Sequence, residues 1–216
     1  MTIDDILAAA SVVPVIEIDD AARAGDLAKA LAAGGLHVAE LTMRTTAALA
    51  SLEAMKAAAP DLIVGMGTII APDQAARAVS AGADFLVTPG TTSALFATLR
   101  EHGVPALPGV ATASEVVAAV EAGFERLKFF PAEAIGGAAA VKSFAGPFPT
   151  VRFCPTGGIS AEKARDYLGL SNVACVGGSW VAPRGAIAAG AWETIEENAR
   201  RAASLAGRAE GRLRCG

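Results

Sequence analysis

The feature of this sequence that most constrains its fold is a regular alternation of short β-rich runs with alanine-rich helical runs. The β-rich runs are residues 12–18, 37–44, 62–69, 85–90, 104–110, 126–131, 151–158 and 173–180. One such run and the helical run after it take roughly 22–25 residues, the length of a strand plus a crossover helix. Because no part of the chain holds only helices or only strands, the alternation predicts an all-parallel sheet.

Helix boundaries can also be predicted from residue types. Pro72, Asp73, Ser114 and Ser160 stand where helical runs begin, and all four are residues that favour a helix start. Several helical runs end in glycine, which is typical of a helix C-terminus. These glycine-terminated runs are residues 21–35, 72–82, 113–123 and 161–169.

Two architectures fit an all-parallel sheet, an open doubly wound sheet and a closed barrel. No GxGxxG follows the first β-rich run, which weakens the dinucleotide-binding form of the open sheet. The count of eight units fits barrel closure. We therefore predict an α/β fold, a single-domain (β/α)8 TIM barrel over residues 1–206, with residues 207–216 forming a frayed C-terminal tail.

Composition and charge exclude several classes of function. The 216 residues carry a net charge of −4, and no run of lysine and arginine is interleaved with aromatics, so nucleic acid is not an expected partner. The first ten residues lack the basic region of a secretory signal, and no apolar run reaches the roughly 18 residues of a membrane span. Three widely spaced cysteines favour a reducing, cytoplasmic location. Only two histidines are present, in no ligand cluster, so no bound metal is expected.

Strand alternation predicts which side chains face the barrel interior. If Leu41 and Met43 pack against the helices, then Glu40 and Arg44 share the inward face of their strand. Both lie at or near the carboxyl end of that strand, where barrel active sites are built.

A lysine is predicted to face the same space. In the run 126–131, an outward Leu127 and Phe129 leave Lys128 and Phe130 pointing inward. The three charged groups could simply form a buried network that satisfies itself, because buried charges are usually paired. Their common position at one end of a barrel favours a functional site.

These three groups suit one kind of chemistry. Burial and a nearby arginine disfavour the ammonium form of a lysine, and a free amine can attack a carbonyl carbon to give a Schiff base. An arginine offers a planar fork for a carboxylate, and a glutamate can move protons. The combination predicts a substrate with a ketone beside a carboxylate, a 2-oxo acid.

Two glycine pairs follow the last two strands, in TGGIS (156–160) and GGSW (177–180). In many barrels these loops bind phosphate through backbone N–H groups. Glycine pairs can also serve only to make tight turns, but two pairs at both expected loops favour a phosphate site. Gly65 and Gly67 are open to two interpretations, clearing space for a ligand or relieving crowding in a narrow barrel.

These motifs resemble a known family, the bacterial 2-dehydro-3-deoxy-6-phosphogluconate (KDPG) aldolases, also described as 4-hydroxy-2-oxoglutarate (KHG) aldolases. The resemblance runs from about Val12 to Trp192, with Met43 as a departure where the family more often has leucine. The motifs that carry it are ELTMRT (40–45), GMGT (65–68), TPG (88–90), FFPAEA (129–134) with the lysine before it, FCPTGGIS (153–160) and GGSW (177–180).

The resemblance implies a role for each matching residue. Lys128 would be the Schiff-base lysine, Glu40 the general acid/base, and Arg44 the arginine that holds the pyruvate carboxylate. The pyruvate pocket would be lined by Thr68, Pro89, Phe130 and Thr156, and the phosphate end by Gly157, Gly158, Gly178 and Ser179.

The resemblance also implies an activity. The chain would be a class I aldolase that cleaves KDPG to pyruvate and glyceraldehyde 3-phosphate, and also KHG to pyruvate and glyoxylate. It would act as a homotrimer, without metal or cofactor, on a small phosphorylated 2-oxo acid and with no membrane partner. Two alternatives stay open, an aldolase for the galactonate epimer and, in another class, a phosphosugar isomerase or epimerase barrel.

Overall fold

The computed structural model of the chain describes residues 1–205. The predicted tail, residues 207–216, and the last residue of the predicted domain lie outside the described residues. Within the described part of the chain, no helix is both long enough and apolar enough to cross a bilayer.

Every β-rich run predicted from the sequence contains a strand, shorter than its run. The strands are β1 (Val12–Ile16), β2 (Val38–Thr42), β3 (Ile63–Gly67), β4 (Leu86–Val87), β5 (Ala106–Leu107), β6 (Gly109–Val110), β7 (Arg126–Phe129), β8 (Arg152–Pro155) and β9 (Val176–Gly178). The run 104–110 gives two strands rather than one because Pro108, between β5 and β6, has no N–H to donate to a ladder.

The helices follow the strands as the alternation predicts, with one addition before β1. They are α1 (Ile3–Ala8), α2 (Ala24–Ala33), α3 (Ala48–Ala58), α4 (Pro72–Ser80), α5 (Ser93–Glu101), α6 (Ala113–Glu121), α7 (Gly137–Ser143), α8 (Ala161–Leu168), α9 (Arg184–Ala189) and α10 (Trp192–Ala203), with 3₁₀ turns at Ala21–Arg23 and Glu133–Ile135.

Local sequence explains most helix ends. Pro72 opens α4, and the Ser160 hydroxyl accepts from the N–H of Lys163 at the start of α8, as predicted. The prediction for Ser114 was wrong, because the cap of α6 is Thr112, whose hydroxyl and backbone N–H exchange hydrogen bonds with Glu115. The glycines after α2, α4 and α6 adopt a left-handed φ of 85° to 88°, whereas α8 ends on a glycine with a right-handed φ of −74°.

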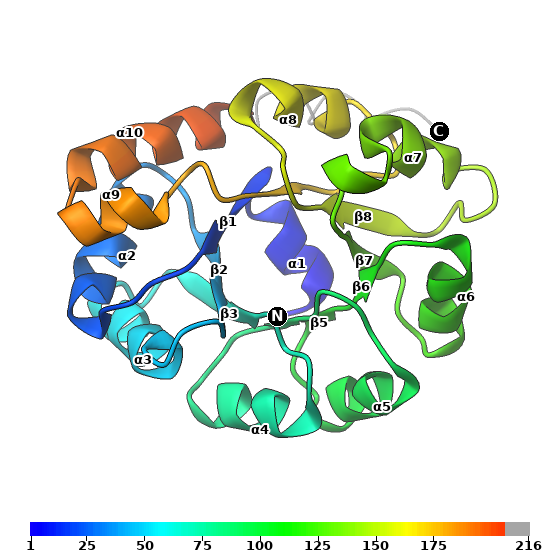
Figure 1. Cartoon of the computed structure of the whole chain (residues 1–216), viewed down its shortest axis with the longest axis horizontal. Helices are drawn as coiled ribbons and strands as arrows, with labels where there is room; N and C mark the ends of the chain where they lie inside the picture. The colour runs from blue at the N-terminus through cyan, green and yellow to red at the C-terminus, as the bar shows by residue number, and fades with distance from the viewer. Residues whose placement is uncertain (206–216) are drawn as a thin grey trace.

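The strands pair in parallel throughout. One sheet has the order β5-β4-β3-β2-β1-β9, and a second has the order β6-β7-β8. Isolated parallel bridges join Phe153 to Val173 and Thr156 to Gly177, between the ends of the two sheets. Figure 1 shows the strands as a curved inner wall, with α1 across its opening and the later helices outside it. The chain therefore has an α/β fold built on a curled parallel sheet.

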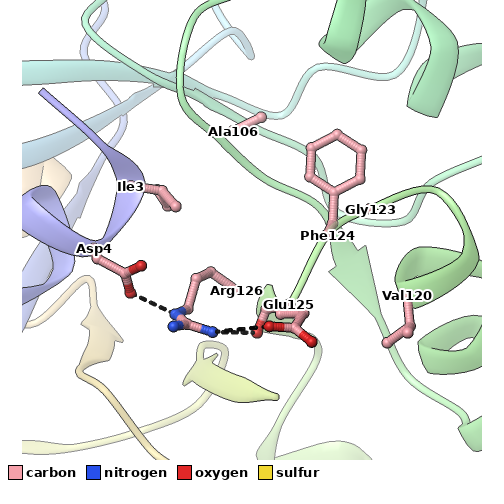
Figure 2. A pocket seen from close by; sticks show the side chains of 8 residues that line it. All are labelled: Ile3, Asp4, Ala106, Val120, Gly123, Phe124, Glu125 and Arg126. Atoms are coloured by element: carbon pink, nitrogen blue, oxygen red, sulfur yellow. Dashed lines mark hydrogen bonds and ion pairs between the residues drawn. The ribbon is translucent and has the colours of Figure 1, made fainter. Parts of the chain in front are cut away.

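The short helix α1 covers the amino ends of the strands, where Ile6 and Leu7 are buried. A hydrogen bond from Arg126 Nε to Asp4 Oδ1, 2.5 Å long, ties α1 to the start of β7 (Figure 2). A cavity of about 330 Å³ opens beside this contact. Its lining residues include none of the predicted site residues and are Ile3, Asp4, Ala106, Val120, Gly123, Phe124, Glu125 and Arg126.

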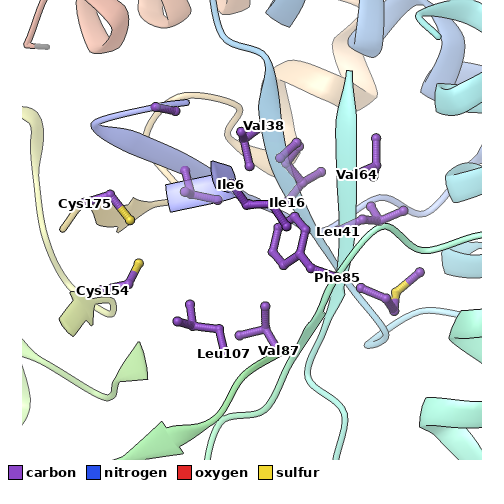
Figure 3. Close-up of a cluster of buried hydrophobic side chains, with 14 of the residues drawn as sticks. Ile6, Ile16, Val38, Leu41, Val64, Phe85, Val87, Leu107, Cys154 and Cys175 are labelled. Carbon is purple, nitrogen blue, oxygen red and sulfur yellow. The ribbon is translucent and has the colours of Figure 1, made fainter. Parts of the chain in front are cut away.

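A core of buried apolar side chains fills the space inside the strands and beneath the helices. Figure 3 shows Ile6, Ile16 and Phe85 within one cluster of it. Phe85 fits there because a Cβ on Gly65 would lie 2.4 Å from its ring. Gly65 therefore relieves crowding, the second of the two interpretations offered above.

Two cysteines belong to this core, as small apolar fillers. Cys154 and Cys175 are free and buried. Contact with Cys154, together with burial, raises the pKa of the Cys175 thiol, which makes it a poor nucleophile.

Candidate active site

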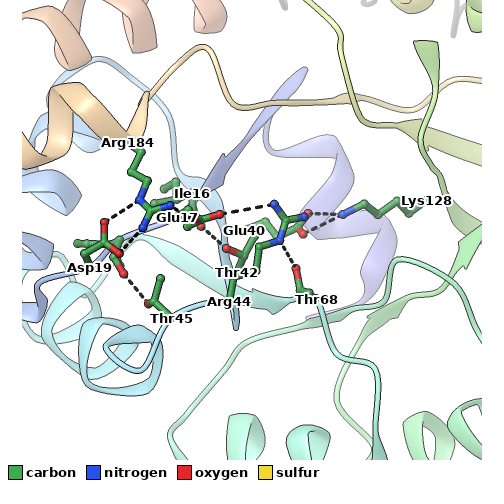
Figure 4. A network of polar contacts seen from close by, with 11 residues as sticks. Ile16, Glu17, Asp19, Glu40, Thr42, Arg44, Thr45, Thr68, Lys128 and Arg184 are labelled. Carbon is green, nitrogen blue, oxygen red and sulfur yellow. Dashed lines mark hydrogen bonds and ion pairs between the residues drawn. The ribbon is translucent and has the colours of Figure 1, made fainter. Parts of the chain in front are cut away.

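β2 and β7 bring two buried charged side chains, Glu40 and Lys128, to one place. Lys128 Nζ donates to Glu40 Oε1 at 2.9 Å and lies 3.3 Å from Oε2 (Figure 4). Each residue is only 3% exposed. The inward direction predicted for both side chains is thus observed, and each buried charge has a partner of opposite sign. The group that accepts from Lys128 is the Glu40 carboxylate.

Gly67, at the end of β3, makes room for this ion pair. A Cβ built on Gly67 would lie 2.1 Å from Glu40 Oε1 and 2.7 Å from the carboxylate carbon. Any larger residue there would push the carboxylate out of its position beside Lys128. Gly67 therefore clears space for the Glu40 side chain.

An aromatic ring lies near the lysine, and a buried threonine lies where β8 meets β9. The Phe130 ring centroid is 5.4 Å from Lys128 Nζ, within range of a cation–π contact. A Cβ on Gly157 would lie 3.2 Å from the Phe130 ring. Thr156 is 5% exposed, and a Cβ on Gly177 would approach its hydroxyl to 2.2 Å. Gly157 thus lets Phe130 pack beside the lysine, and Gly177 lets β9 approach Thr156 closely.

Arg44 lies beyond the carboxyl end of β2, where the space inside the strands opens to solvent; we call this opening the mouth. Its side chain is 44% exposed, and its Nε donates to Thr68 Oγ1 at 3.2 Å. Thr68 has a φ of 60°, a strained conformation for a β-branched residue. Strain of this kind is often found at sites of function, and here it falls on the residue that accepts from Arg44.

Three further residues join Arg44 at the mouth and were not predicted as site residues. Arg44 Nη1 lies 3.6 Å from Glu17 Oε2, and Glu17 Oε1 accepts from Arg184. Arg184 also donates through Nε and Nη2 to the two oxygens of Asp19, both at 2.7 Å (Figure 4). Glu17 directly follows β1, so the rule that singled out Arg44, a charge at a strand's carboxyl end, could have found it.

The predicted phosphate residues lie in the turn after β8 and at the carboxyl end of β9. Gly157 and Gly158 both have left-handed φ values, 106° and 77°, which keep the turn after β8 tight. Gly178 lies against Trp180, since a Cβ there would be 2.6 Å from the indole nitrogen. Ser179 is exposed, and its hydroxyl makes no hydrogen bond within residues 1–205.

Glu133 contacts the turn after β8, which contains Gly157 and Gly158. Its carboxylate accepts from Lys163 and from the hydroxyl of Tyr167, and these two bonds lower the pKa of Glu133. Burial and the bond to Glu133 raise the pKa of Tyr167. The Glu133 N–H also donates to the carbonyl of Gly157 at 3.1 Å. Glu133 therefore connects the loop after β7 to the loop after β8.

The predicted residues therefore fall into contacting groups. One group holds Glu40, Lys128 and Phe130, and the Phe130 ring packs against Gly157. A second group holds Arg44 and Thr68. Pro89 follows β4, where its backbone lies against Gly109. In the described part of the chain, neither Pro89, Gly178 nor Ser179 hydrogen-bonds to Lys128.

The fold and this site define an α/β protein whose candidate active site is built around a buried lysine–glutamate pair. Comparisons with known proteins identify the family. A family model described as aldolase, KDPG and KHG aldolase, matches residues 3–198. The chain belongs to the KDPG and KHG aldolase family.

Individual relatives agree with this family. The chain is 46% identical to a 2-dehydro-3-deoxy-phosphogluconate aldolase of Pseudoalteromonas atlantica over 92% of each chain. It is 45% identical to the KHG/KDPG aldolase of Escherichia coli K12, over 92% of this chain and 93% of that one. A crystal structure of KDPG aldolase from Legionella pneumophila, with pyruvate captured at low pH as a covalent carbinolamine, has a TM-score of 0.92. That match has 43% identity and covers 94% of this chain and 98% of the other.

Proposed function

We propose that this chain is a class I aldolase that cleaves KDPG to pyruvate and glyceraldehyde 3-phosphate, and KHG to pyruvate and glyoxylate. The observation that carries the proposal is the buried contact of 2.9 Å between Lys128 Nζ and Glu40 Oε1. A nucleophilic amine and a proton-transfer group stand in direct contact there, away from bulk water. The covalent pyruvate carbinolamine in the Legionella relative and the name of the Escherichia coli relative support the assignment.

The first half of the reaction forms the Schiff base. A proton moves from the Lys128 ammonium to the Glu40 carboxylate along their hydrogen bond, which leaves an amine and an acid. The amine attacks C2 of the substrate, and the π electrons of the C2–O bond move to the oxygen. The attacking nitrogen then gives up a proton to this oxygen, which becomes the hydroxyl of a carbinolamine. Glu40 then protonates that hydroxyl, which leaves as water, and an iminium remains on Lys128.

The second half breaks the carbon–carbon bond. Glu40, now a carboxylate again, takes the proton of the C4 hydroxyl, and the electrons of the C3–C4 bond move into the iminium. The aldehyde product leaves and an enamine remains. Glu40 returns its proton to C3, and water hydrolyses the resulting iminium to pyruvate and the Lys128 ammonium. One group thus acts alternately as base and acid.

The other predicted residues hold the two ends of the substrate. The Arg44 guanidinium binds the carboxylate beside the ketone, and Thr68, Pro89, Phe130 and Thr156 line the pyruvate pocket. Gly157, Gly158, Gly178 and Ser179 hold the phosphate. Fixing both ends keeps the C3–C4 bond in register with Lys128 and Glu40.

The test combines turnover with trapping of the Schiff base by borohydride. Wild-type protein treated with pyruvate and borohydride should gain one reduced pyruvyl group and lose activity. Lys128→Ala and Lys128→Arg should show neither adduct nor turnover. Alanine has no amine, and the arginine guanidinium stays protonated. Lys142→Arg, the same change at an exposed lysine of α7, is the matched control. Full turnover in either Lys128 variant contradicts the proposal, and a wild type without an adduct would favour an isomerase.

The proposed reaction needs no metal or cofactor, because the iminium on Lys128 is itself the electron sink. Turnover should therefore survive dialysis against EDTA. A loss of activity that zinc or magnesium restores would overturn this part of the proposal.

We also propose that the two sheets are parts of one closed eight-stranded barrel in a single domain. β5 and β6 are consecutive in sequence around Pro108 and supply the edges of the two sheets. The bridges at Phe153 and Thr156 join β8 to the segment of β9. A crystal structure with an unpaired edge at either junction would contradict closure.

The assembly is proposed to be a homotrimer. Val117 and Val120 on α6 are 45% and 38% exposed and offer apolar surface to another copy. Sedimentation equilibrium should give three times the monomer mass, whereas a stable monomer would remove the trimer and leave the chemistry untouched.

A further inference from the structure

Glu17 contacts Arg44, the group that the proposed reaction assigns to the substrate carboxylate. The Glu17 carboxylate divides its two oxygens, with Oε2 3.6 Å from Arg44 Nη1 and Oε1 accepting from Arg184. The contact with Arg44 is an ion pair at a distance too long for a hydrogen bond. Arg44 is therefore partly engaged by a carboxylate of the protein's own chain.

Arg184 holds Glu17 in this shared position, and Asp19 in turn holds Arg184. The Asp19–Arg184 contact uses two parallel hydrogen bonds of 2.7 Å, the geometry that fixes a guanidinium most firmly. The bond from Arg184 lowers the pKa of Asp19, and the bond to Asp19 raises the pKa of Arg184. Both groups keep their charge at neutral pH, so Arg184 remains available to hold one oxygen of Glu17.

We propose that Glu17 competes with the substrate carboxylate for Arg44, and that Arg184 limits this competition by holding one oxygen of Glu17. Glu17 then lowers the affinity of the site for the carboxylate of a 2-oxo acid. This inference rests on the proposed function, because it takes Arg44 to be the carboxylate-binding group.

The geometry decides the direction of each effect. Arg44 Nε is already bound to Thr68, which leaves the terminal nitrogens for an incoming carboxylate. Glu17 faces one of these nitrogens and must give way for a bidentate contact with substrate. If Arg184 were removed, both oxygens of Glu17 could turn to Arg44 and the competition would strengthen. If Glu17 lost its charge, the competition would end.

The effects should be modest, because the Glu17 and Arg44 side chains are 26% and 44% exposed and water screens their attraction. Glu17→Gln should lower the half-saturating concentration of pyruvate about two- to fivefold, the range expected for an exposed ion pair. Arg184→Met should raise it by a similar factor. The double variant should behave like Glu17→Gln, because Arg184 acts only through Glu17.

The experiment measures the initial rate of borohydride trapping against pyruvate concentration in the full-length protein. Each variant is first checked for the wild-type circular dichroism spectrum and thermal melt. The half-saturating concentration reports carboxylate binding, and the limiting rate at saturating pyruvate reports the chemistry. A purely structural role for Glu17 would lower the limiting rate or the melting temperature without improving binding.

Asp20→Asn is the matched control, because Asp20 lines the same cavity as Glu17 and Arg184 but forms no ion pair with Arg44 among residues 1–205. Its side chain caps the turn at Ala21–Arg23, a role that asparagine can fill. If Asp20→Asn tightens pyruvate binding as much as Glu17→Gln does, a general charge effect replaces the proposal. The proposal is also overturned if Glu17→Gln leaves binding unchanged or weaker, or if the double variant returns to the wild-type value. Absence of trapping in the wild type would instead refute the aldolase itself.

Discussion

A methyl group added at Gly67 tests how closely the reaction depends on the position of Glu40. The Cβ of Gly67→Ala would lie 2.1 Å from Glu40 Oε1, whereas ordinary van der Waals contact begins at 3.4 Å. The carboxylate would have to retreat by about 1.3 Å, since the Cβ is fixed to the backbone of β3. That displacement would break or distort the contact of 2.9 Å with Lys128.

The expected loss of activity follows from this geometry. A misplacement of about 1 Å in a catalytic group can lower turnover about 100-fold. Separating the buried pair should also destabilise the protein, by up to about 3–5 kcal/mol if neither charge finds a new partner. We therefore expect Gly67→Ala to fold, to melt at a lower temperature, and to lose about two orders of magnitude in kcat.

The assay is steady-state cleavage of KDPG, coupled to reduction of the pyruvate formed, alongside a thermal melt. Gly146→Ala is the control, because a Cβ at Gly146 has no neighbour within 4 Å. It should match the wild type in both measurements. A Gly67→Ala variant with kcat within threefold of wild type, and with Glu40 still in contact with Lys128 in its crystal structure, would refute the reasoning.

Three further predictions follow from neighbouring contacts. Thr68→Gly should raise the free energy of unfolding by about 1 kcal/mol, because glycine adopts a φ of 60° without strain. It should also weaken pyruvate binding, because Arg44 loses its hydrogen-bond partner. A lower free energy of unfolding with unchanged pyruvate binding would contradict both parts. Tyr167→Phe should cost about 1–2 kcal/mol in urea unfolding at pH 7, because it removes a hydrogen bond to the Glu133 carboxylate; unchanged stability would count against this bond. Hydrogen bonds from Lys163 and Tyr167 hold the pKa of Glu133 below its ordinary value of 4.5. The difference in free energy of unfolding between wild type and Glu133→Gln should therefore be largest above pH 4.5. It should shrink as the pH falls through the pKa of Glu133 in the folded protein. A difference that stays constant from pH 7 to pH 3 would contradict this linkage.

Much of the fold could be predicted because its signal is periodic. Each of the eight β-rich runs contains a strand, since branched residues and glycine-terminated helices recur at even spacing. The six-residue helix α1 was missed because it is too short to show an apolar period. Its signal was Thr2 with Asp5, which form a capping box. The same pattern, Thr112 with Glu115, would have corrected the predicted start of α6.

In the candidate site, too, residues inside strands could be predicted and residues in loops could not. Glu40 and Lys128 could be predicted to meet because strand alternation fixes the direction of a side chain inside a regular strand. Arg44 lies past the end of β2, so alternation could not predict its exposure or its partners. The contacts of Arg44 with Glu17 and of Glu133 with Tyr167 join different loops, whose conformations no period in the sequence determines. Loop contacts of this kind required the structure.

The most direct test of the account asks where pyruvate becomes covalently bound. Wild-type protein would be reduced with borohydride in the presence of isotope-labelled pyruvate, digested, and sequenced by tandem mass spectrometry. The account predicts the label on Lys128 alone, at close to one group per chain. Label distributed over surface lysines, or a stoichiometric adduct at any other residue, would contradict it.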